Sequence, residues 1–493
     1  MKFKAKILNI ATKGPLIAIL NKIDVQTLSL IALDRIRIKK KDKSKVVAID
    51  IAYGKKEVMP GEIGLFLDIA DELGIKERDE IEIFLEAKPE SLQYIKKKLD
   101  KKELNKYEID KIIKDLLANK LTEVEVTYFT AACYINKMTL EESAYLAEAI
   151  VNNGGKLKFN KKIIVGKHCI GGLSGNRTTP IVVSIVAAAG ITIPKTSTRS
   201  ITSPAGTADC FEVLAPVSHS KEKIIDIVKK TNGCMVWGGT LDLASADDKL
   251  IQLEKPLSLD PEGFLLASIL AKKSAEDCTH VLIDIPIGPE AKIKEKKEAK
   301  NLSEKFIKLG KKLNIKIKTI ITDGSQPIGN GIGPALEAKD VLLIIKNKNC
   351  PKDLKKKSLY MAGIIFEMVG YKNGNKKALE ILESGKAYKK LQEIIKEQGG
   401  NPNIQPEDIK IGEYKYTFKS HKNGKIKHIS NALVTRIAKS AGAPNDKGAG
   451  VYLHKKVGDK VNTNEQLFTI YAESKDKLTF SMKENLNEVM KID

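Results

Sequence analysis

The sequence has few cysteines and few aromatic residues. Its six cysteines are scattered through 493 residues without a Cys-x-x-Cys pair, and Phe, Trp and Tyr together make up 5% of the chain. The cysteine pattern argues against both a disulfide framework and a zinc module, and it is typical of a reducing compartment. So few aromatic side chains also argue against a surface on which nucleobases stack, as in RNA-binding modules.

A long apolar run is missing as well. The longest smooth apolar stretch, IVVSIVAAAGITIP, is shorter than the roughly 20 residues that span a bilayer. The first ten residues, MKFKAKILNI, alternate polar and apolar side chains where a signal peptide would have an apolar core. We therefore expect a cytoplasmic protein with no membrane partner.

Acidic residues are outnumbered, and the formal net charge is +22. The lysines are spread along the chain and mixed with glutamates in helix-like stretches such as AKIKEKKEAKNLSEKFIKLGKKL, which is typical of solvated helix faces. We therefore expect no nucleic-acid partner, although a basic RNA-binding protein is a distant alternative. The same charge favours long-range attraction of an anionic substrate.

The length predicts several domains, because one hydrophobic core stops growing well below 493 residues. Residues 1–86 carry strand-like alternation and repeat the pattern Asp-x-Ile-x-Ile, which indicates a small β-rich N-terminal domain of structural use, with a barrel as the expected form. Residues 87–160 read as a helical domain, with capping-box spacing at Thr122/Glu125 and Thr139/Glu142.

The remaining chain divides into two parts. Residues 161–400 alternate apolar strands with amphipathic helices, which predicts a large, mostly parallel α/β domain whose ligands lie beyond the carboxyl ends of the strands. A Gly/Pro/Asn-rich linker follows, and residues 405–493 form a β-rich C-terminal domain with an expected hairpin around Asn423-Gly424.

The loop KHCIGGLSGNRTTP, residues 167–180, joins a predicted strand to a predicted helix. Its three glycines permit close backbone approach, and backbone N–H groups at a helix start bind anions. Lys167, His168 and Arg177 add charged or titratable donors. An ordinary tight turn is the alternative, but the combination favours a phosphate site, with Lys167 and His168 as phosphate-binding candidates.

A second loop, TSTRSITSPAGTAD, begins at Thr196 and again precedes a helix. It holds seven hydroxyl residues and one arginine, whereas an ordinary cap needs one or two hydroxyls. This surplus favours a phosphorylated ligand. Two anion loops predict either one ligand with two phosphates or a phosphorylated substrate together with inorganic phosphate.

Four further polar residues lie where they could take part in chemistry. Asp260 lies before Pro261 at a helix start, where an N-cap is the simple reading and a general acid the functional one. Ser268 and Lys272 share a helix face at i and i+4, and Lys292 follows a strand that ends in Gly288-Pro289.

The motifs KHCIGG and ASILAKK, together with the hydroxyl loop, resemble the thymidine/pyrimidine nucleoside phosphorylase family. GNRTTP, VWGGTLDLASADD, LSLDPE and IDIPIGP are more similar to the branch of that family that acts on nucleoside 5′-monophosphates, and the resemblance covers essentially the whole chain. It implies a nucleoside-phosphorylase-type helical domain to which residues 245–275 return. It also implies phosphorolysis of AMP, and of CMP and UMP, to free base and ribose 1,5-bisphosphate.

The resemblance also implies roles for individual residues. Asp260 would give a proton to the leaving base. The implied nucleotide contacts are Gly172, Thr198, Arg199, Ser200, Ile201, Thr202, Ser203, Thr207, Ser268 and Lys292. No metal and no cofactor is implied, since phosphate is a co-substrate, and a homo-oligomer of two or more chains is expected.

Two departures from the family pattern stand out. Cys169 occupies the place of a serine, and a thiol is the weaker hydrogen-bond donor. Leu253 stands near the place of the base-binding arginine of the pyrimidine enzymes, which argues against the alternative of a pyrimidine or thymidine nucleoside phosphorylase. Anthranilate phosphoribosyltransferases share the fold type, but no acidic diphosphate–magnesium site is evident.

Overall fold

The computed structural model describes residues 1–12, 16–54, 56–200, 203–241, 243–254, 259 and 261–493. The chain forms two compact units. The first contains Met1–Gly154 and Ala244–Ala271, and the second contains Gly155–Leu243 and Lys272–Asp493. No helix within the described ranges is long and apolar enough to cross a membrane.

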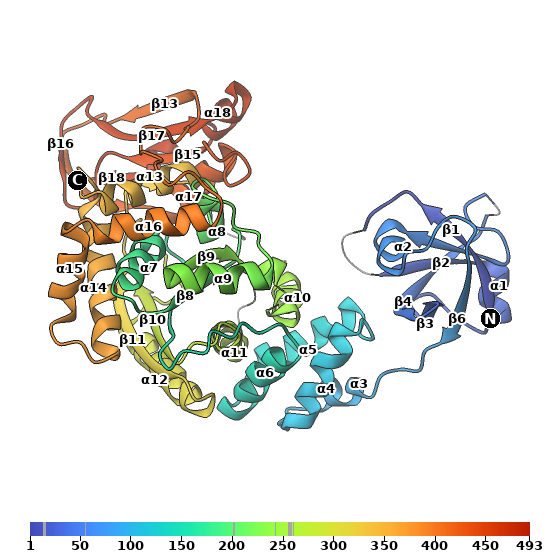
Figure 1. Cartoon of the computed structure of the whole chain (residues 1–493). Coiled ribbons are helices and arrows are strands. Elements are labelled where there is room, and N and C mark those ends of the chain that lie inside the picture. The colour runs from blue at the N-terminus through green and yellow to red at the C-terminus, as the bar shows by residue number, and fades with distance from the viewer. Residues whose placement is uncertain (13–15, 55, 201–202, 242, 255–258, 260) are drawn as a thin grey trace. The chain divides into compact units, whose positions relative to one another are not determined.

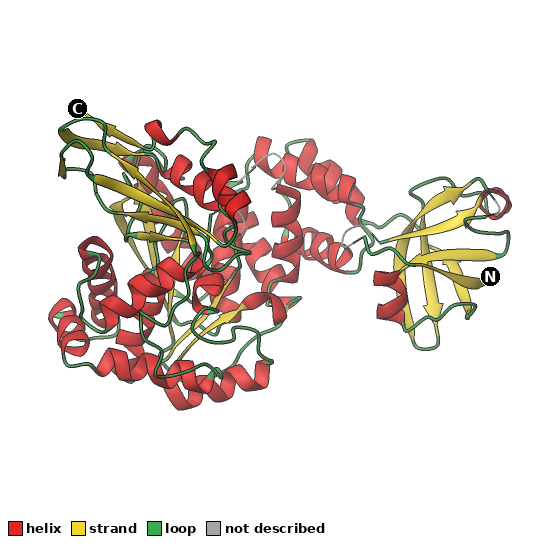
Figure 2. Cartoon of the chain, turned by 90° about the horizontal axis from the view of Figure 1, so that it is seen from above, coloured by secondary structure: helices red, strands yellow, loops and turns green. Residues whose placement is uncertain are grey.

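The N-terminal part of the first unit is a closed β-barrel (Figure 2), as the alternating pattern predicts. Ile38 and Ile83, the last residues of the two Asp-x-Ile-x-Ile repeats, lie opposite each other on paired strands, and both are buried. The strands follow one another around the barrel in the order β1 (Lys2–Leu8), β5 (Glu62–Phe66), β2 (Ile17–Asn21), β4 (Lys43–Ala52), β3 (Arg35–Lys40) and β6 (Glu80–Leu85). Two short helices, α1 (Lys22–Thr27) and α2 (Leu67–Leu73), pack on it.

Helices make up the rest of the first unit. Both predicted capping boxes are confirmed: Thr122 and Glu125 begin α5, and Thr139 and Glu142 begin α6, each with reciprocal side-chain and backbone hydrogen bonds. The helices are α3 (Ser91–Leu99), α4 (Lys106–Leu117), α5 (Glu123–Ile135), α6 (Leu140–Asn152), α10 (Ser245–Glu254) and most of α11 (Glu262–Ala275).

Parallel strands form the centre of the second unit, as expected for an α/β domain (Figure 1). β10 (His280–Ile287) lies between β11 (Lys316–Asp323) and β7 (Val165–Cys169), and its nearly continuous apolar burial is typical of a parallel central strand. β8 (Ile193–Ser197) pairs in parallel with β9 (Gly233–Trp237), and a parallel bridge from Ile164 to Thr192 joins the two sets. β7 and β8 therefore end at the same edge, where the two predicted loops begin.

Eight α-helices are described around these strands. α7 is buried throughout from Thr178 to Ala187, because this run of small and β-branched side chains carries no charge. The helices are α7 (Thr178–Ala188), α8 (Thr207–Phe211), α9 (Lys221–Thr231), α12 (Lys296–Lys312), α13 (Pro334–Ile345), α14 (Lys352–Met368), α15 (Gly374–Glu383) and α16 (Lys386–Glu397), with the 3₁₀ turn η1 (Gly238–Thr240) after β9.

The C-terminal segment is β-rich, but the predicted hairpin is wrong. The strands on either side of Asn423 lie in different sheets, because β13 (Tyr414–Lys419) pairs with β17 (Gln466–Ala472) whereas β14 (Gly424–Ile429) pairs with β16 (Lys460–Val461) and β18 (Met490–Ile492). The Asn423 carboxamide accepts hydrogen bonds from the backbone and hydroxyl of Thr463. A distant segment thus uses the residue that would otherwise shape a two-residue turn.

The C-terminal sheet includes a piece of the α/β domain. β12 (Gly331–Ile332) pairs with β15 (Gly450–Leu453), which pairs in turn with β17. Three short helical segments complete this part: α17 (Asn431–Ser440), α18 (Lys475–Ser481) and η3 (Leu486–Glu488). The C-terminal segment is therefore joined to the α/β domain through a shared sheet.

Candidate functional site

The glycines of the first loop allow it to pack tightly against two other segments. Gly171, Gly172 and Gly175 have φ angles of 94°, 83° and 70°, in the left-handed region that favours glycine. A Cβ on Gly172 would lie 2.8 Å from the backbone nitrogen of Lys292, and one on Gly175 would lie 2.2 Å from the carbonyl oxygen of Ile328. The loop after β7 is therefore in contact with the turn that carries Lys292.

Lys167 is buried at the start of this loop. Its Nζ donates to the hydroxyls of Thr178 and Thr179, at 2.7 and 3.2 Å, in the first turn of α7. Burial lowers the pKa of its ammonium to about 8. The side chain thus bridges the two ends of the glycine loop and carries a charge that little water stabilises.

His168 differs from the cationic donor expected from sequence. Burial lowers its pKa well below the usual value, and the nearby Lys195 and Lys273 add to that effect. Its Nδ1 is buried and has no hydrogen-bond partner within the described part of the chain. A neutral imidazole with a spare nitrogen can hydrogen-bond a ligand, but it brings no charge to an anion.

Cys169 is held within the loop. The Asn176 amide donates to its Sγ at 3.3 Å, and burial raises the pKa of the thiol to about 11. The sulfur is therefore protonated at neutral pH and acts as a weak acceptor for a neighbouring side chain, not as a nucleophile.

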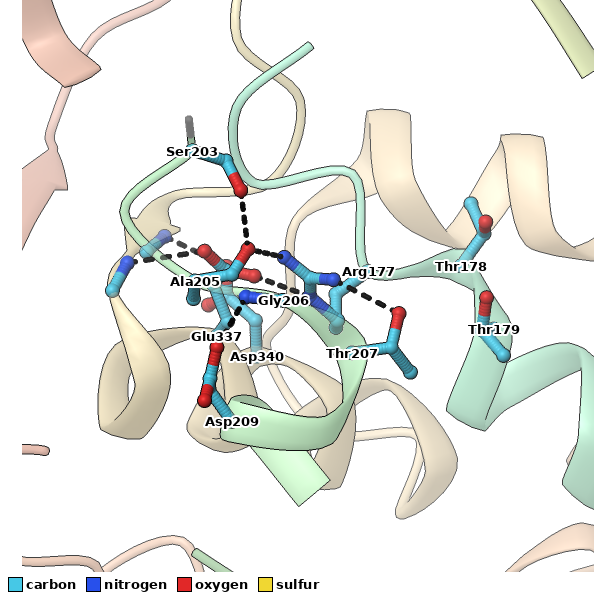
Figure 3. A network of polar contacts seen from close by, with 12 residues as sticks. Arg177, Thr178, Thr179, Ser203, Ala205, Gly206, Thr207, Asp209, Glu337 and Asp340 are labelled. Carbon is cyan, nitrogen blue, oxygen red and sulfur yellow. Dashed lines mark hydrogen bonds and ion pairs between the residues drawn. The ribbon is translucent and has the colours of Figure 1, made fainter. Parts of the chain in front are cut away.

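Arg177 connects the two predicted anion loops (Figure 3). Its guanidinium forms a buried ion pair with Glu337 and donates to Ala205 O at 2.9 Å and to the Thr207 hydroxyl at 3.1 Å. Its donors therefore go to protein groups, whereas the sequence suggested a ligand. The sequence did not indicate the ion pair between Arg177 and Glu337, because the two residues lie 160 positions apart in the chain.

The hydroxyl loop is held partly by its own side chains (Figure 3). Asp209 accepts from the backbone N–H groups of Ser200 and Gly206, at 2.7 and 2.9 Å. Ser200 donates to Ser203 O, and the Ser203 hydroxyl donates to Ala205 O. Several hydroxyls that the sequence assigned to a ligand therefore stabilise the loop.

The two other assigned residues at the start of this loop differ in exposure. Thr198 is exposed, whereas Arg199 is half-buried. Arg199 forms a two-pronged ion pair with Glu212, and its Cζ lies 5.0 Å from the centre of the Trp237 ring. Ile201 and Thr202 lie outside the described residues. Thr198, Arg199, Ser200 and Ser203 lie in the loop between β8 and α8, and Thr207, at the start of α8, is the one of these assigned residues that contacts Arg177 among the described hydrogen bonds.

The remaining assigned residues fall in both units. Lys292 is exposed on the second unit, against Gly172. Ser268 belongs to the first unit, where its hydroxyl donates to Asp247 at 2.8 Å. Asp260, the expected proton donor, lies outside the described residues.

Sequence reasoning missed a buried polar cluster behind β8. Lys273 and Glu276 form an ion pair and are both fully buried, and the Thr196 hydroxyl donates to the same carboxylate. Although burial opposes ionisation, Lys273 and Lys195 lower the pKa of Glu276. The signal in the sequence was Lys195, a lysine inside the strand IPKTS. After burial itself, Lys195 and Lys273 of this cluster contribute to the lowered pKa of His168.

Family models of known proteins match three stretches of the chain. The glycosyl transferase family model matches in two parts, a helical bundle domain over residues 92–154 and an a/b domain over residues 161–388. The pyrimidine nucleoside phosphorylase C-terminal domain matches residues 425–493.

Curated relatives extend the similarity to nearly the full length. The AMP phosphorylase of Thermococcus sibiricus is 46% identical over 481 residues, which is 97% of this chain and 95% of that protein. The AMP phosphorylases of Pyrococcus furiosus and Methanococcus maripaludis are 45% and 44% identical, covering 97% and 94% of this chain and 95% and 92% of theirs.

A solved structure supports the fold independently. The anthranilate phosphoribosyltransferase of Thermus thermophilus superposes with a TM-score of 0.52 at 16% identity, covering 62% of this chain and 98% of that one. At this identity the match concerns the fold alone.

Proposed function

Because this chain belongs to the AMP phosphorylases, within the thymidine/pyrimidine nucleoside phosphorylase family, we propose that it cleaves AMP with inorganic phosphate. The products are adenine and ribose 1,5-bisphosphate. The observation that supports this best is the pair of loops that leave the parallel strands β7 and β8 at one edge and are joined through Arg177. Two adjacent anion loops suit a reaction whose substrates carry one phosphate each.

The chemistry is a substitution at the anomeric carbon. A phosphate oxygen forms the new bond to C1′ while the bond from C1′ to the base nitrogen breaks and its electron pair leaves with the base. The sugar gains oxocarbenium character, and the base takes up a proton as it departs. The enzyme must therefore hold phosphate in line with C1′ and supply an acid to the base.

Lys167 and His168 are the proposed phosphate-binding residues. Lys167 offers the only charge of the pair, and burial makes that charge effective because little water screens it. His168 offers its ring nitrogen Nδ1, which has no hydrogen-bond partner among the described residues, as a neutral hydrogen-bonding group. Fixed donors of this kind hold the anionic oxygens of phosphate in position for attack without having to reorganise.

The nucleotide is proposed to lie along the hydroxyl loop and the turn at Lys292. Lys292 is exposed and its backbone packs against Gly172, so its ammonium suits the 5′-phosphate, and Thr198 is exposed in the neighbouring loop. Ser268, on the first unit, is the proposed contact to the base, and Asp260 is the proposed acid. The proposed enzyme needs no metal or other cofactor, works in the cytoplasm and assembles as a homo-oligomer.

Product analysis tests the function directly. The protein is incubated in phosphate buffer with AMP, CMP, UMP and GMP, and with adenosine and thymidine as unphosphorylated controls. We expect release of adenine with one equivalent of ribose 1,5-bisphosphate from AMP, and cleavage of CMP and UMP. Faster cleavage of thymidine or adenosine than of any monophosphate would support a pyrimidine nucleoside phosphorylase instead.

A further inference from the structure

The C-terminal segment contacts two of the proposed ligand loops directly. The contacts come from one end of α17, and all of their residues belong to the second unit. They involve polar groups with specific geometry, in contrast to the apolar packing that joins other parts of this unit.

Asn431 holds the glycine loop on both sides. Its Oδ1 accepts from the backbone nitrogen of Ser174 at 2.8 Å, and its Nδ2 donates to Gly172 O at 3.3 Å. One turn further along the same helix face, the Thr435 hydroxyl lies 2.6 Å from the hydroxyl of Ser174. These bonds fix a loop whose three glycines would otherwise leave it many conformations.

Glu290 fixes the neighbouring turn to the same helix end. One of its oxygens accepts from the backbone nitrogen of Ala432 at 2.7 Å and from the Ser430 hydroxyl at 3.2 Å, and the other lies 3.1 Å from His428 Nε2. A carboxylate at a helix N-terminus is stabilised by the helix dipole. Glu290 is two residues from Lys292, so its anchoring sets where the backbone of that lysine lies.

We propose that Asn431, Thr435 and Glu290 are positioning residues for nucleotide binding. Through them α17 holds the loop of Gly172 and the turn of Lys292 at the spacing that the nucleotide requires. The two loops already meet closely, since a Cβ on Gly172 would lie 2.8 Å from Lys292 N. This inference rests on the proposed function, because it takes these two loops as nucleotide-binding.

The test compares hydroxyl deletions at two positions of one helix, α17. Thr435→Val removes the contact to Ser174, and Ser440→Ala removes a hydroxyl that donates to Glu484 inside the C-terminal segment, at 3.1 Å. Asn431→Ala is combined with Thr435→Val to release the loop fully. Full-length variants are compared by melting temperature, by kcat and KM with AMP, and by calorimetric AMP binding.

For Asn431→Ala/Thr435→Val we expect a KM for AMP at least tenfold above wild type, with kcat within threefold. Thr435→Ser alone keeps the hydroxyl that contacts Ser174 and should have the wild-type KM. Ser440→Ala should also leave the KM unchanged. Glu290→Gln keeps the shape but loses the charge and should also raise KM. A purely structural role predicts instead that the double variant and Ser440→Ala both lower the melting temperature with KM unchanged, which would overturn the proposal.

Direct binding separates this inference from the function on which it rests. If wild type binds AMP but releases no adenine, the proposed reaction fails, and the positioning role is then decided by the dissociation constant of AMP alone. A tenfold weaker binding in the double variant supports it, and an unchanged constant refutes it.

Discussion

Lys167 illustrates at the scale of one residue how a proposed phosphate-binding group can cost stability. Its folded pKa of about 8 lies below the ordinary 10.5, so between these values the unfolded chain binds a proton that the folded protein has released. The free energy of unfolding then rises with pH in this window. Below pH 8 the buried charge costs roughly 3 kcal/mol, from the pKa difference.

We therefore predict that Lys167→Met is more stable than wild type below pH 8 and that this advantage disappears toward pH 10.5. The variant should also lose at least 100-fold in kcat/KM for phosphate, and in wild type this quantity should fall as pH rises through 8. Denaturant titrations and initial rates at pH 7 to 10.5 measure both effects. A variant less stable than wild type at pH 7 would show that the hydrogen bonds to Thr178 and Thr179 outweigh the cost of burial.

Asp260 carries the proton-transfer prediction. Asp260→Asn keeps the size of the side chain but cannot protonate the leaving base, so we expect kcat to fall by about 10² to 10⁴. AMP binding, measured by calorimetry, should stay within a few fold of wild type. An unchanged kcat would remove Asp260 as the acid, and a loss of binding alone would make it a substrate contact.

At the scale of elements, the helix α6 begins at a buried ion pair. Lys98 Nζ lies 2.7 and 2.8 Å from the two oxygens of Glu142, whose carboxylate also accepts the backbone N–H groups of Leu104 and Thr139. Both side chains are almost wholly buried, with 3% and 1% exposed. Removal of one partner leaves the other charge buried without compensation.

Neighbouring lysines allow a matched comparison. We predict that Lys98→Met destabilises the protein by about 3–5 kcal/mol, because Glu142 loses its counter-charge. Lys97→Met should cost under about 1 kcal/mol, because Lys97 pairs with Glu108 and is one-third exposed. Calorimetric melting measures the stability of both variants. An equal loss of stability in the two would show that the backbone N–H donors alone stabilise the buried Glu142 carboxylate.

The elements also show where sequence reasoning succeeds. The capping boxes at Thr122 and Thr139 could be predicted because a helix start depends on residues three positions apart. The hairpin at Asn423 could not, since its strands pair with segments some 40 residues further along or more. For the same reason the sequence did not show that Glu337 is the partner of Arg177. It also did not show that Asn431 is the partner of Ser174, because these two residues lie 257 positions apart.

At the scale of the whole molecule, the N-terminal barrel displays apolar side chains that its own fold does not bury. Tyr53 is 77% exposed, Ile31 69%, Ile10 59% and Leu85 59%. Several exposed apolar side chains on one domain are typical of a surface that binds another protein. We therefore expect the barrel to contribute to assembly of the homo-oligomer.

Removal of residues 1–86 tests this expectation. The barrel's Arg35 donates to Lys120 O and pairs with Glu125, so the truncated chain should also carry Glu125→Gln to avoid an unpaired carboxylate. Light scattering should give fewer subunits per particle than the full-length protein. An unchanged subunit number would place the oligomer contacts outside the barrel.

Arg177 has a consequence for how binding at the two proposed ligand loops is coupled. Since one guanidinium anchors both the loop after β7 and the loop after β8, a ligand that rigidifies either loop removes part of the entropic cost of ordering the other. Such a linkage is reciprocal: each substrate tightens the binding of its partner by the same factor. If phosphate and nucleotide bind to these two loops as proposed, we expect each of them to bind more tightly once the other is bound, so that either substrate alone binds weakly.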